Sequence, residues 1–179
     1  MANNYMIDIE TFGTAPSTVV TAVGIVVFNK ERILDTLTVH LDIKEQIEAQ
    51  RQIDGSTILW WLRQSKEAQN ALLSGQSIAK SVMAGLKEIE DLFKTYSPGG
   101  VWGNASTFDN VIVSDLFRQA RRKQPWDFWN DRCYRTMKNV YPDVKIKTVG
   151  VKHDALSDAI SQAEHLMEIQ KAYPEAKIL

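Results

Sequence analysis

Apolar and polar residues alternate at the start of the chain, over residues 5–11. Successive side chains of a strand point to opposite faces, so Asp8 and Glu10 share one face while Ile7 and Ile9 share the other. The pattern predicts a buried strand with its two carboxylates about 7 Å apart along the axis. Such carboxylates repel each other and lose hydration, and a hard cation between them would relieve both costs. The D-x-E tripeptide is common, however, and an ordinary strand with a wet acidic face fits it equally well.

Two further stretches, residues 19–28 and 33–41, are rich in β-branched residues, and the polar turn 29–31 joins them. Such a pair is typical of an antiparallel hairpin, so we expect the first three strands to form a meander. Residues 101–104 form a short apolar burst after the helix-breaking sequence of residues 97–100. A helix that leads back to a short buried strand indicates a crossover, which makes this strand parallel to the first.

Helical patterns fill much of the remaining chain. The clearest is an amphipathic helix that we expect to begin at Ser77, with inward residues at spacings of three and four: Ile78, Val82, Leu86, Ile89 and Phe93. Ser56 or Thr57 is expected to cap an earlier helix, and Ser106 or Thr107 a later one. Other helices are expected over residues 44–52, 67–73, 131–141 and 154–172, with a loop or short strand at residues 148–152.

These elements predict an α/β fold, namely a mixed five-stranded sheet flanked by helices on both faces. That arrangement is compatible with a ribonuclease H-like architecture, although propensity does not reveal the order of the strands. The length of 179 residues suits a single domain over residues 1–179.

Composition narrows the class of protein. The hydrophobic share of 44% and the charged share of 24% are those of a globular protein, and no apolar run approaches the roughly 20 residues of a membrane span. We expect no signal peptide and a cytoplasmic location, because the first residues lack a charged and apolar leader and Cys133 alone cannot form an internal disulfide. The net charge of −1 conceals an asymmetry, since residues 115–152 carry ten basic and four acidic residues. This distribution allows nucleic-acid binding.

Three further polar residues stand at element boundaries. Asp109 follows the predicted fourth strand and lies in the first turn of a helix, where the macrodipole alone would favour a carboxylate. Asp154 is the expected cap of the last helix, which leaves His153 in the loop before it and Asp158 about one turn inside. An exposed loop histidine and a solvated helix face are the plain alternatives. The small neighbour Ala155 instead suggests close packing around Asp158.

Taken together, these residues resemble the signature of the DEDDh 3′–5′ exonucleases. Asp8-Ile9-Glu10, Asp109 and His153-x-Ala155-x-x-Asp158 fill its positions in chain order, over residues 5 to about 170. Residues 58–61 and 130–136 look most similar to the compact exoribonuclease-like and phage exonuclease A-like branch. In one departure, Phe12-Gly13 follows Thr11 where many relatives have glycine directly.

The resemblance implies two Mg²⁺ ions, which Mn²⁺ is expected to replace. Asp8 would bridge the ions, Glu10 and Asp158 would complete the site on the side of the nucleophile, and Asp109 would hold the second ion. His153 would take the proton from the attacking water, because an imidazole pKa near 6.5 suits a general base.

Substrate contacts are predicted less sharply. Aromatic residues could stack on bases and basic residues could follow phosphates: Phe12, Trp60, Trp61, Phe108, Arg132 and Arg135. Adjacent helical residues point about 100° apart, so one of the two tryptophans is expected in the core. Thr11 begins a loop expected to offer N–H groups to the terminal sugar, with Phe12 as a wedge. His40 and His165 read as structural, and a solvated helix face is the alternative for the basic residues.

The leading hypothesis is a metal-dependent 3′–5′ exonuclease acting on the 3′ ends of single-stranded DNA or RNA. One alternative is a catalytically inactive nucleic-acid-binding module of the same fold, and another is a structural protein whose carboxylates hold a stabilising cation. All five signature residues are intact, which favours the enzyme. The sequence leaves DNA against RNA open, and the resemblance also allows a homodimer.

Overall fold

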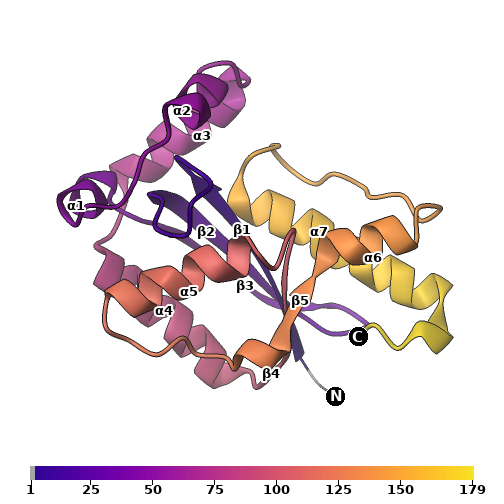
Figure 1. Cartoon of the computed structure of the whole chain (residues 1–179). Coiled ribbons are helices and arrows are strands. Elements are labelled where there is room, and N and C mark those ends of the chain that lie inside the picture. The colour runs from indigo at the N-terminus through magenta and orange to yellow at the C-terminus, as the bar shows by residue number, and fades with distance from the viewer. Residues whose placement is uncertain (1–2) are drawn as a thin grey trace.

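Five strands form one mixed sheet in the order β3-β2-β1-β4-β5 (Figure 1). The structure is a computed structural model and describes residues 3–179. The strands are β1 Asn3–Thr11, β2 Val20–Phe28, β3 Ile33–His40, β4 Pro98–Gly103 and β5 Asp131–Cys133. β1, β2 and β3 pair antiparallel, whereas β4 runs parallel to both β1 and β5. The predicted meander and the predicted parallel crossover are therefore confirmed.

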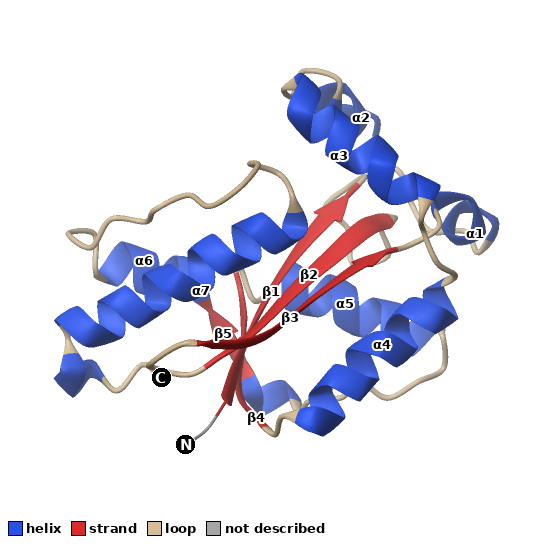
Figure 2. Ribbon diagram, turned by 180° about the vertical axis from the view of Figure 1, so that it is seen from behind, coloured by secondary structure: helices blue, strands red, loops and turns tan. Residues whose placement is uncertain are grey.

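Helices cover both faces of this sheet, as Figure 2 shows from behind. On one face, α4 Val82–Thr95 and α5 Asp109–Gln119 pack against the Ile7 and Ile9 side of β1. On the other face, α7 Ala155–Ala172 and the start of α6 Tyr134–Val140 pack against Met6 and Trp102. The alternation along β1 thus sends Ile7 and Ile9 into one core, while Asp8 and Glu10 face the α7 side.

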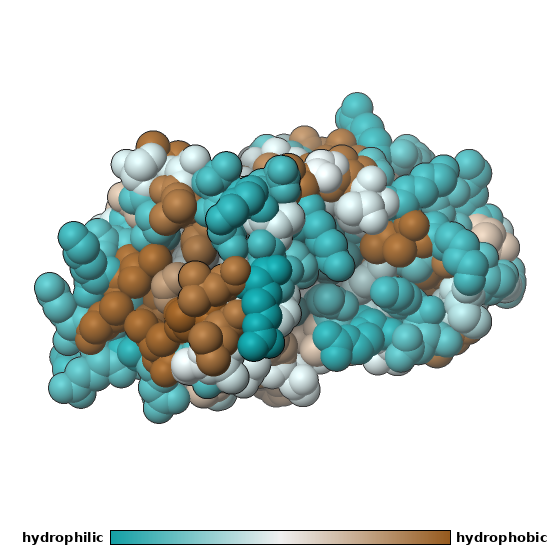
Figure 3. Space-filling model, turned by 90° about the horizontal axis from the view of Figure 1, so that it is seen from above, coloured by the Kyte–Doolittle hydropathy of each residue, from teal (hydrophilic) through white to brown (hydrophobic). Residues whose placement is uncertain are grey.

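Three short helices gather at the end of the molecule where β1 finishes (Figure 1). They are α1 Ile43–Glu48, α2 Gly55–Trp61 and α3 Lys66–Ser77. Seen from above, apolar side chains gather over α2 and α3 (Figure 3), where Leu59, Leu62 and Leu73 are exposed. Two single-turn 3₁₀ helices, Phe128–Asn130 and Pro174–Ala176, complete the described elements. No helix in residues 3–179 combines the length and hydropathy needed to cross a membrane.

Two helix starts differ from the prediction. Asp54, not Ser56 or Thr57, caps α2, because its carboxylate accepts the Ser56 N–H at 3.0 Å. Ser81 caps α4, so the helix expected to begin at Ser77 begins at Val82. Ile78 continues the apolar spacing but is 68% exposed, because it ends α3 rather than lying inside α4.

The region after β4 also departs from the prediction. The N-cap residue of α5 is Phe108, and neither Ser106 nor Thr107 caps the helix with its side chain. Asp131 begins strand β5 instead of a helix. Its carboxylate accepts hydrogen bonds from Asn110 Nδ2 at 2.7 Å and Trp126 Nε1 at 2.9 Å, and these hold the segment beside β4. The fifth strand is therefore residues 131–133, while residues 148–152 form no strand.

Candidate active site

Asp8 lies buried on β1, opposite Gly24 of β2. A side chain at position 24 would overlap the backbone of Ala155, so the absence of one lets α7 begin directly against the sheet. This close approach brings α7 to Asp8, whose Oδ1 accepts a hydrogen bond from Gln162 Nε2 at 2.7 Å. A glycine on the neighbouring strand thus determines which helical side chains reach the first carboxylate.

Glu10, His153 and Asp158 converge beside Asp8. One possible ligand atom from each lies within 4.8 Å of the other two. Asp154 caps α7 as predicted, accepting the Ser157 N–H at 3.0 Å, and Asp158 stands in the first turn. The His153 N–H donates to Asp158 Oδ2 at 3.1 Å, and its φ of 64° is the left-handed conformation. That conformation is costly for a residue with a side chain and is found mainly where surrounding contacts enforce it.

Asp109 comes from the start of α5, which packs on the face of the sheet opposite α7. It is buried in the first turn of α5, and its Oδ2 accepts the Ala105 N–H at 3.2 Å. A Cβ on Gly103 would stand only 2.9 Å from Asp109 Cβ, so this glycine lets α5 begin close to the end of β4. All five predicted signature residues line one cavity of about 370 Å³.

Burial and mutual repulsion make these carboxylates reluctant to ionise. Burial, then the Asp109 charge, raises the pKa of Asp8 well above its usual range. Burial and the Asp158 charge raise the pKa of Glu10 to about 8, and burial raises the pKa of Asp109 to about 6. The pKa of Asp158 is also raised by burial, whereas burial lowers the pKa of His153. The neutral form of the His153 imidazole is therefore favoured at neutral pH.

The residues present fit a divalent cation. Carboxylate oxygens are the ligands that hard cations prefer, and an imidazole nitrogen is compatible with several divalent metals. A cation near Asp8 would offset the repulsion that, together with burial, raises the pKa of Asp8 and of Glu10, because opposite charge favours the ionised form. Gln162 also lines the cavity, and its buried Oε1 has no hydrogen-bond partner within the described protein. The repelling carboxylates and the unpaired Gln162 oxygen both indicate that the cavity binds a further group, namely a cation with its water molecules.

A second cavity of about 450 Å³ adjoins the first at Glu10 and Phe108. Trp60 and Trp61 both line it, but they differ in exposure: Trp61 is 4% exposed and Trp60 41%. Trp61 Nε1 donates to the Thr11 carbonyl at 2.9 Å, which anchors α2 to the end of β1. The Trp60 ring stands 4.8 Å from the His153 ring, edge to face. Trp61 is therefore the core tryptophan, and Trp60 is the one available to a ligand.

Other predicted contacts are placed differently. Phe12 is half-buried, and its N–H already donates to the Val19 carbonyl at 2.9 Å, so that N–H is not free for a sugar. Phe12 lies outside the linings of both cavities, whereas Thr11 and Phe108 line the second. Arg135 lines the first cavity, but Arg132 is exposed and donates to the Trp129 carbonyl at 2.7 Å.

Sequence reasoning missed several residues of the acidic cavity. Lys138 and Lys152 line it beside Arg135, and Gln162 lies against Asp8. Gln162 follows Asp158 by four residues, which is the spacing of one helical face, so that interval was the available signal. His165 is structural as predicted: its ring nitrogens pair with Tyr134 Oη at 2.7 Å and the Val144 carbonyl at 2.8 Å.

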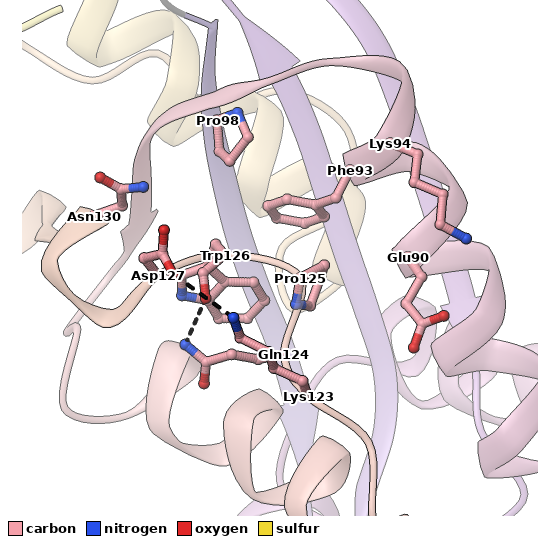
Figure 4. A pocket seen from close by; sticks show the side chains of 10 residues that line it. All are labelled: Glu90, Phe93, Lys94, Pro98, Lys123, Gln124, Pro125, Trp126, Asp127 and Asn130. Atoms are coloured by element: carbon pink, nitrogen blue, oxygen red, sulfur yellow. Dashed lines mark hydrogen bonds and ion pairs between the residues drawn. The ribbon is translucent and has the colours of Figure 1, made fainter.

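A separate cavity of about 550 Å³ lies near the start of β4, between α4 and the segment before β5 (Figure 4). Phe93, Pro98 and Trp126 give it apolar walls, and Lys94 and Lys123 stand at its edge. The sequence-predicted site residues do not line it. Its chemistry is therefore distinct from that of the acidic cavity.

The sheet and the helices on both faces form the fold seen in a DEDDh family member, and the acidic cavity gathers the five signature residues within it. The chain belongs to the family described as the 3′-5′ exoribonuclease Rv2179c-like domain, whose model matches residues 3–170. It is accordingly a 3′–5′ exonuclease.

Individual relatives agree with this family. The exodeoxyribonuclease of Enterobacteria phage T4 is 26% identical over 160 residues, covering 74% of this chain and 69% of that protein. The nuclease domain of 3′hExo, a DEDDh family member solved with rAMP, is 15% identical with a TM-score of 0.67, covering 96% of this chain and 92% of that one. The zinc-bound complex of E. coli exonuclease I with single-stranded DNA is 12% identical with a TM-score of 0.72. That match covers 98% of this chain but spans only 42% of the exonuclease I chain.

Proposed function

We propose that this exonuclease removes nucleotides from the 3′ ends of single-stranded DNA or RNA, using two divalent cations and His153 as general base. The observation that carries the proposal is the convergence of Glu10, His153 and Asp158 within 4.8 Å, beside buried Asp8. Asp109 enters the same cavity from α5. Relatives solved with single-stranded DNA and with rAMP support a substrate of this kind.

The carboxylates would hold the cations. Asp109, Glu10 and Asp158 all lie close enough to Asp8 to raise its pKa, and we assign Asp8 the shared ligand position. Divalent cations bound there would supply Lewis acidity for the phosphate and the leaving oxygen. We propose Mg²⁺, with Mn²⁺ able to replace it, because carboxylate-rich sites suit both ions.

His153 would accept the proton of the attacking water at its imidazole ring. Burial lowers the pKa of His153, so the ring is neutral and able to accept a proton at neutral pH. The Trp60 ring and the His153 N–H to Asp158 hydrogen bond hold the histidine at the cavity mouth. These contacts would orient the ring before substrate arrives.

The adjoining cavity would receive the terminal nucleotide. Trp60 and Phe108 offer aromatic faces there, and base stacking on such faces contributes about 1–3 kcal/mol per base. Glu10 lines both cavities and would accept a hydrogen bond from the 3′-hydroxyl. Arg135, Lys138 and Lys152 would contact the preceding phosphates.

The experiment compares matched 5′-labelled DNA and RNA strands with free or blocked 3′ ends, in Mg²⁺ or in chelator. We expect a ladder from free 3′ ends in Mg²⁺ and none in chelator. Shortening that ignores the 3′ block or survives chelation would overturn the proposal. Strand binding without shortening would instead support a non-catalytic binding module. The relative rates on the two strands would decide between DNA and RNA.

A further inference from the structure

Gln162 is an unusual residue to find beside an acidic cluster. It lies on α7, one turn after Asp158, and its side chain is 5% exposed while lining the acidic cavity. Its Nε2 donates to Asp8 Oδ1 at 2.7 Å. Among the side chains packed around Asp8, this amide is a neutral donor placed against the carboxylate assigned the shared ligand position.

The geometry fixes which way the amide faces. Once Asp8 is ionised, as cation binding requires, a flipped amide would place its oxygen against the Asp8 carboxylate, where both atoms are acceptors and repel. The donor therefore faces Asp8, and Oε1 points away from it. That oxygen is buried and has no partner among residues 3–179.

A buried acceptor without a donor costs free energy, and ordered water commonly satisfies such groups. One other buried side-chain oxygen in the described chain lacks a partner, Asn110 Oδ1, which lies against Gly103 and outside the lining of the acidic cavity. Gln162 differs because its unpaired oxygen belongs to a residue of the cavity wall, where waters of an occupied cation site would lie.

We propose that Gln162 is a positioning residue of the cation site. Its N–H group holds Asp8 through Oδ1 and leaves Oδ2 for the cations, and its Oε1 accepts a hydrogen bond from a water molecule of the occupied site. This inference rests on the proposed function, since it assumes that cations bind among the four carboxylates. It adds a residue outside the five-residue signature, and a neutral one.

The test measures Mn²⁺ binding by calorimetry for the wild type, Gln162→Met and a matched control, Gln170→Met. Gln170 lies on the same helix but bonds the C-terminal segment, accepting the Ile178 N–H at 2.7 Å. Loss of an outer hydrogen bond to a metal ligand typically weakens binding by about 10–100-fold. We expect that loss in Gln162→Met, with kcat reduced and the KM for the strand unchanged, and wild-type affinity in Gln170→Met.

Wild-type Mn²⁺ affinity in a folded Gln162→Met protein would overturn the inference and leave the proposed function standing. A wild type that binds no Mn²⁺ would overturn both. If Gln162→Met does not fold, the side-chain amide resonance of Gln162 is followed in the wild type during a Mg²⁺ titration. It should shift together with the Asp8 backbone amide. A stationary Gln162 signal beside a shifting Asp8 signal would refute the role.

Discussion

Ionisation of Glu10 couples the site to the stability of the fold. Its pKa is raised from 4.5 to about 8, first by burial and then by Asp158. Between pH 4.5 and 8, the folded chain therefore keeps a proton on Glu10 that the unfolded chain has lost. The free energy of unfolding falls as pH rises through this window. In chelator we expect the melting temperature to fall from pH 4.5 to 8, and Glu10→Gln to remove much of the fall.

Mg²⁺ should restore the melting temperature at the upper end of that window, because cations replace the lost protons. Asp8→Asn should melt no lower than the wild type in chelator, since it removes one of several clustered charges. A melting temperature that rises with pH in metal-free buffer would contradict this picture of repelling carboxylates.

His153 gives a second prediction at the residue scale. Burial lowers its pKa below the usual 6.5, so the rate should rise through a pKa below that value and then level off. His153→Ala should flatten that rising limb and reduce turnover by roughly 10²–10⁴-fold. The measurement is a pH–rate profile of both proteins at saturating Mg²⁺. If the rising limb of the pH–rate profile is unchanged in His153→Ala, the ionising group that controls the rate is one of the carboxylates and not His153.

Some residues of the site could be predicted from the sequence and others could not. The grouping of Asp8, Glu10, Asp109, His153 and Asp158 in one cavity was predictable because together, in chain order, they match a family signature, although each pattern alone is common. The choice between Trp60 and Trp61 was not, because α2 is one short helix whose inner side depends on its contact with Thr11. Gln162 was missed because a glutamine four residues beyond an aspartate has many uses other than holding a carboxylate.

At the scale of elements, alternation, β-branched runs and one short apolar burst predicted the first four strands, since those patterns follow directly from burial. Helix starts were less accessible. Ser77 and Ser81 are both adequate caps, and Ile78 extends the apolar spacing backward, so only packing decides that α4 begins at Val82. Strand β5 was hidden because three residues carry too short a pattern, and the hydrogen bonds to Asp131 that place them are long-range.

The junction of β2 and α7 is testable through Gly24. Gly24→Ala would push its Cβ into the backbone of Ala155 and shift the start of α7 away from Asp8. Displacements of about 1 Å can cost on the order of 10²-fold in rate, and such overpacking typically destabilises by about 1–3 kcal/mol. We expect both effects in activity assays and thermal melts. Gly55→Ala is the control, because a Cβ there meets no atom within 4 Å, and it should leave activity unchanged.

For the whole molecule, the relevant property is how charge is distributed around the acidic cavity. Lys138 and Lys152 line it, although the chain has a net charge of −1. Each phosphate contact contributes about 0.7 to the salt dependence of single-strand affinity. In an Asp8→Asn background, Lys138→Ala and Lys152→Ala should each weaken strand binding and lower that slope. Lys87→Ala, on α4 across the sheet and paired with Asp91, should do neither, and an equal loss there would argue against phosphate contacts in the cavity.

The strand order β3-β2-β1-β4-β5 is a property of the whole chain, and it determines which elements meet at the site. It places β1 between β2 and β4, so Gly24 of β2 opens space for α7 on one side while β4 leads into Asp109 on the other. No local pattern encodes that order. The signature residues predicted the fold only through the family resemblance, which requires carboxylates from three separate segments to meet at one site.

The measurement that tests the central claim most directly is the initial rate on one oligonucleotide bearing a 3′-hydroxyl, a 3′-phosphate or a 5′-phosphate, for the wild type and Asp8→Asn in Mg²⁺. A 3′-phosphate would bring extra negative charge against buried Glu10, where repulsion is weakly screened. We predict fast cleavage of the 3′-hydroxyl and 5′-phosphate strands, slow cleavage of the 3′-phosphate strand, and none by Asp8→Asn. Equal wild-type rates on the two kinds of 3′ end, or undiminished cleavage by Asp8→Asn, would contradict the assignment of this cavity as the site where the 3′ end is cut.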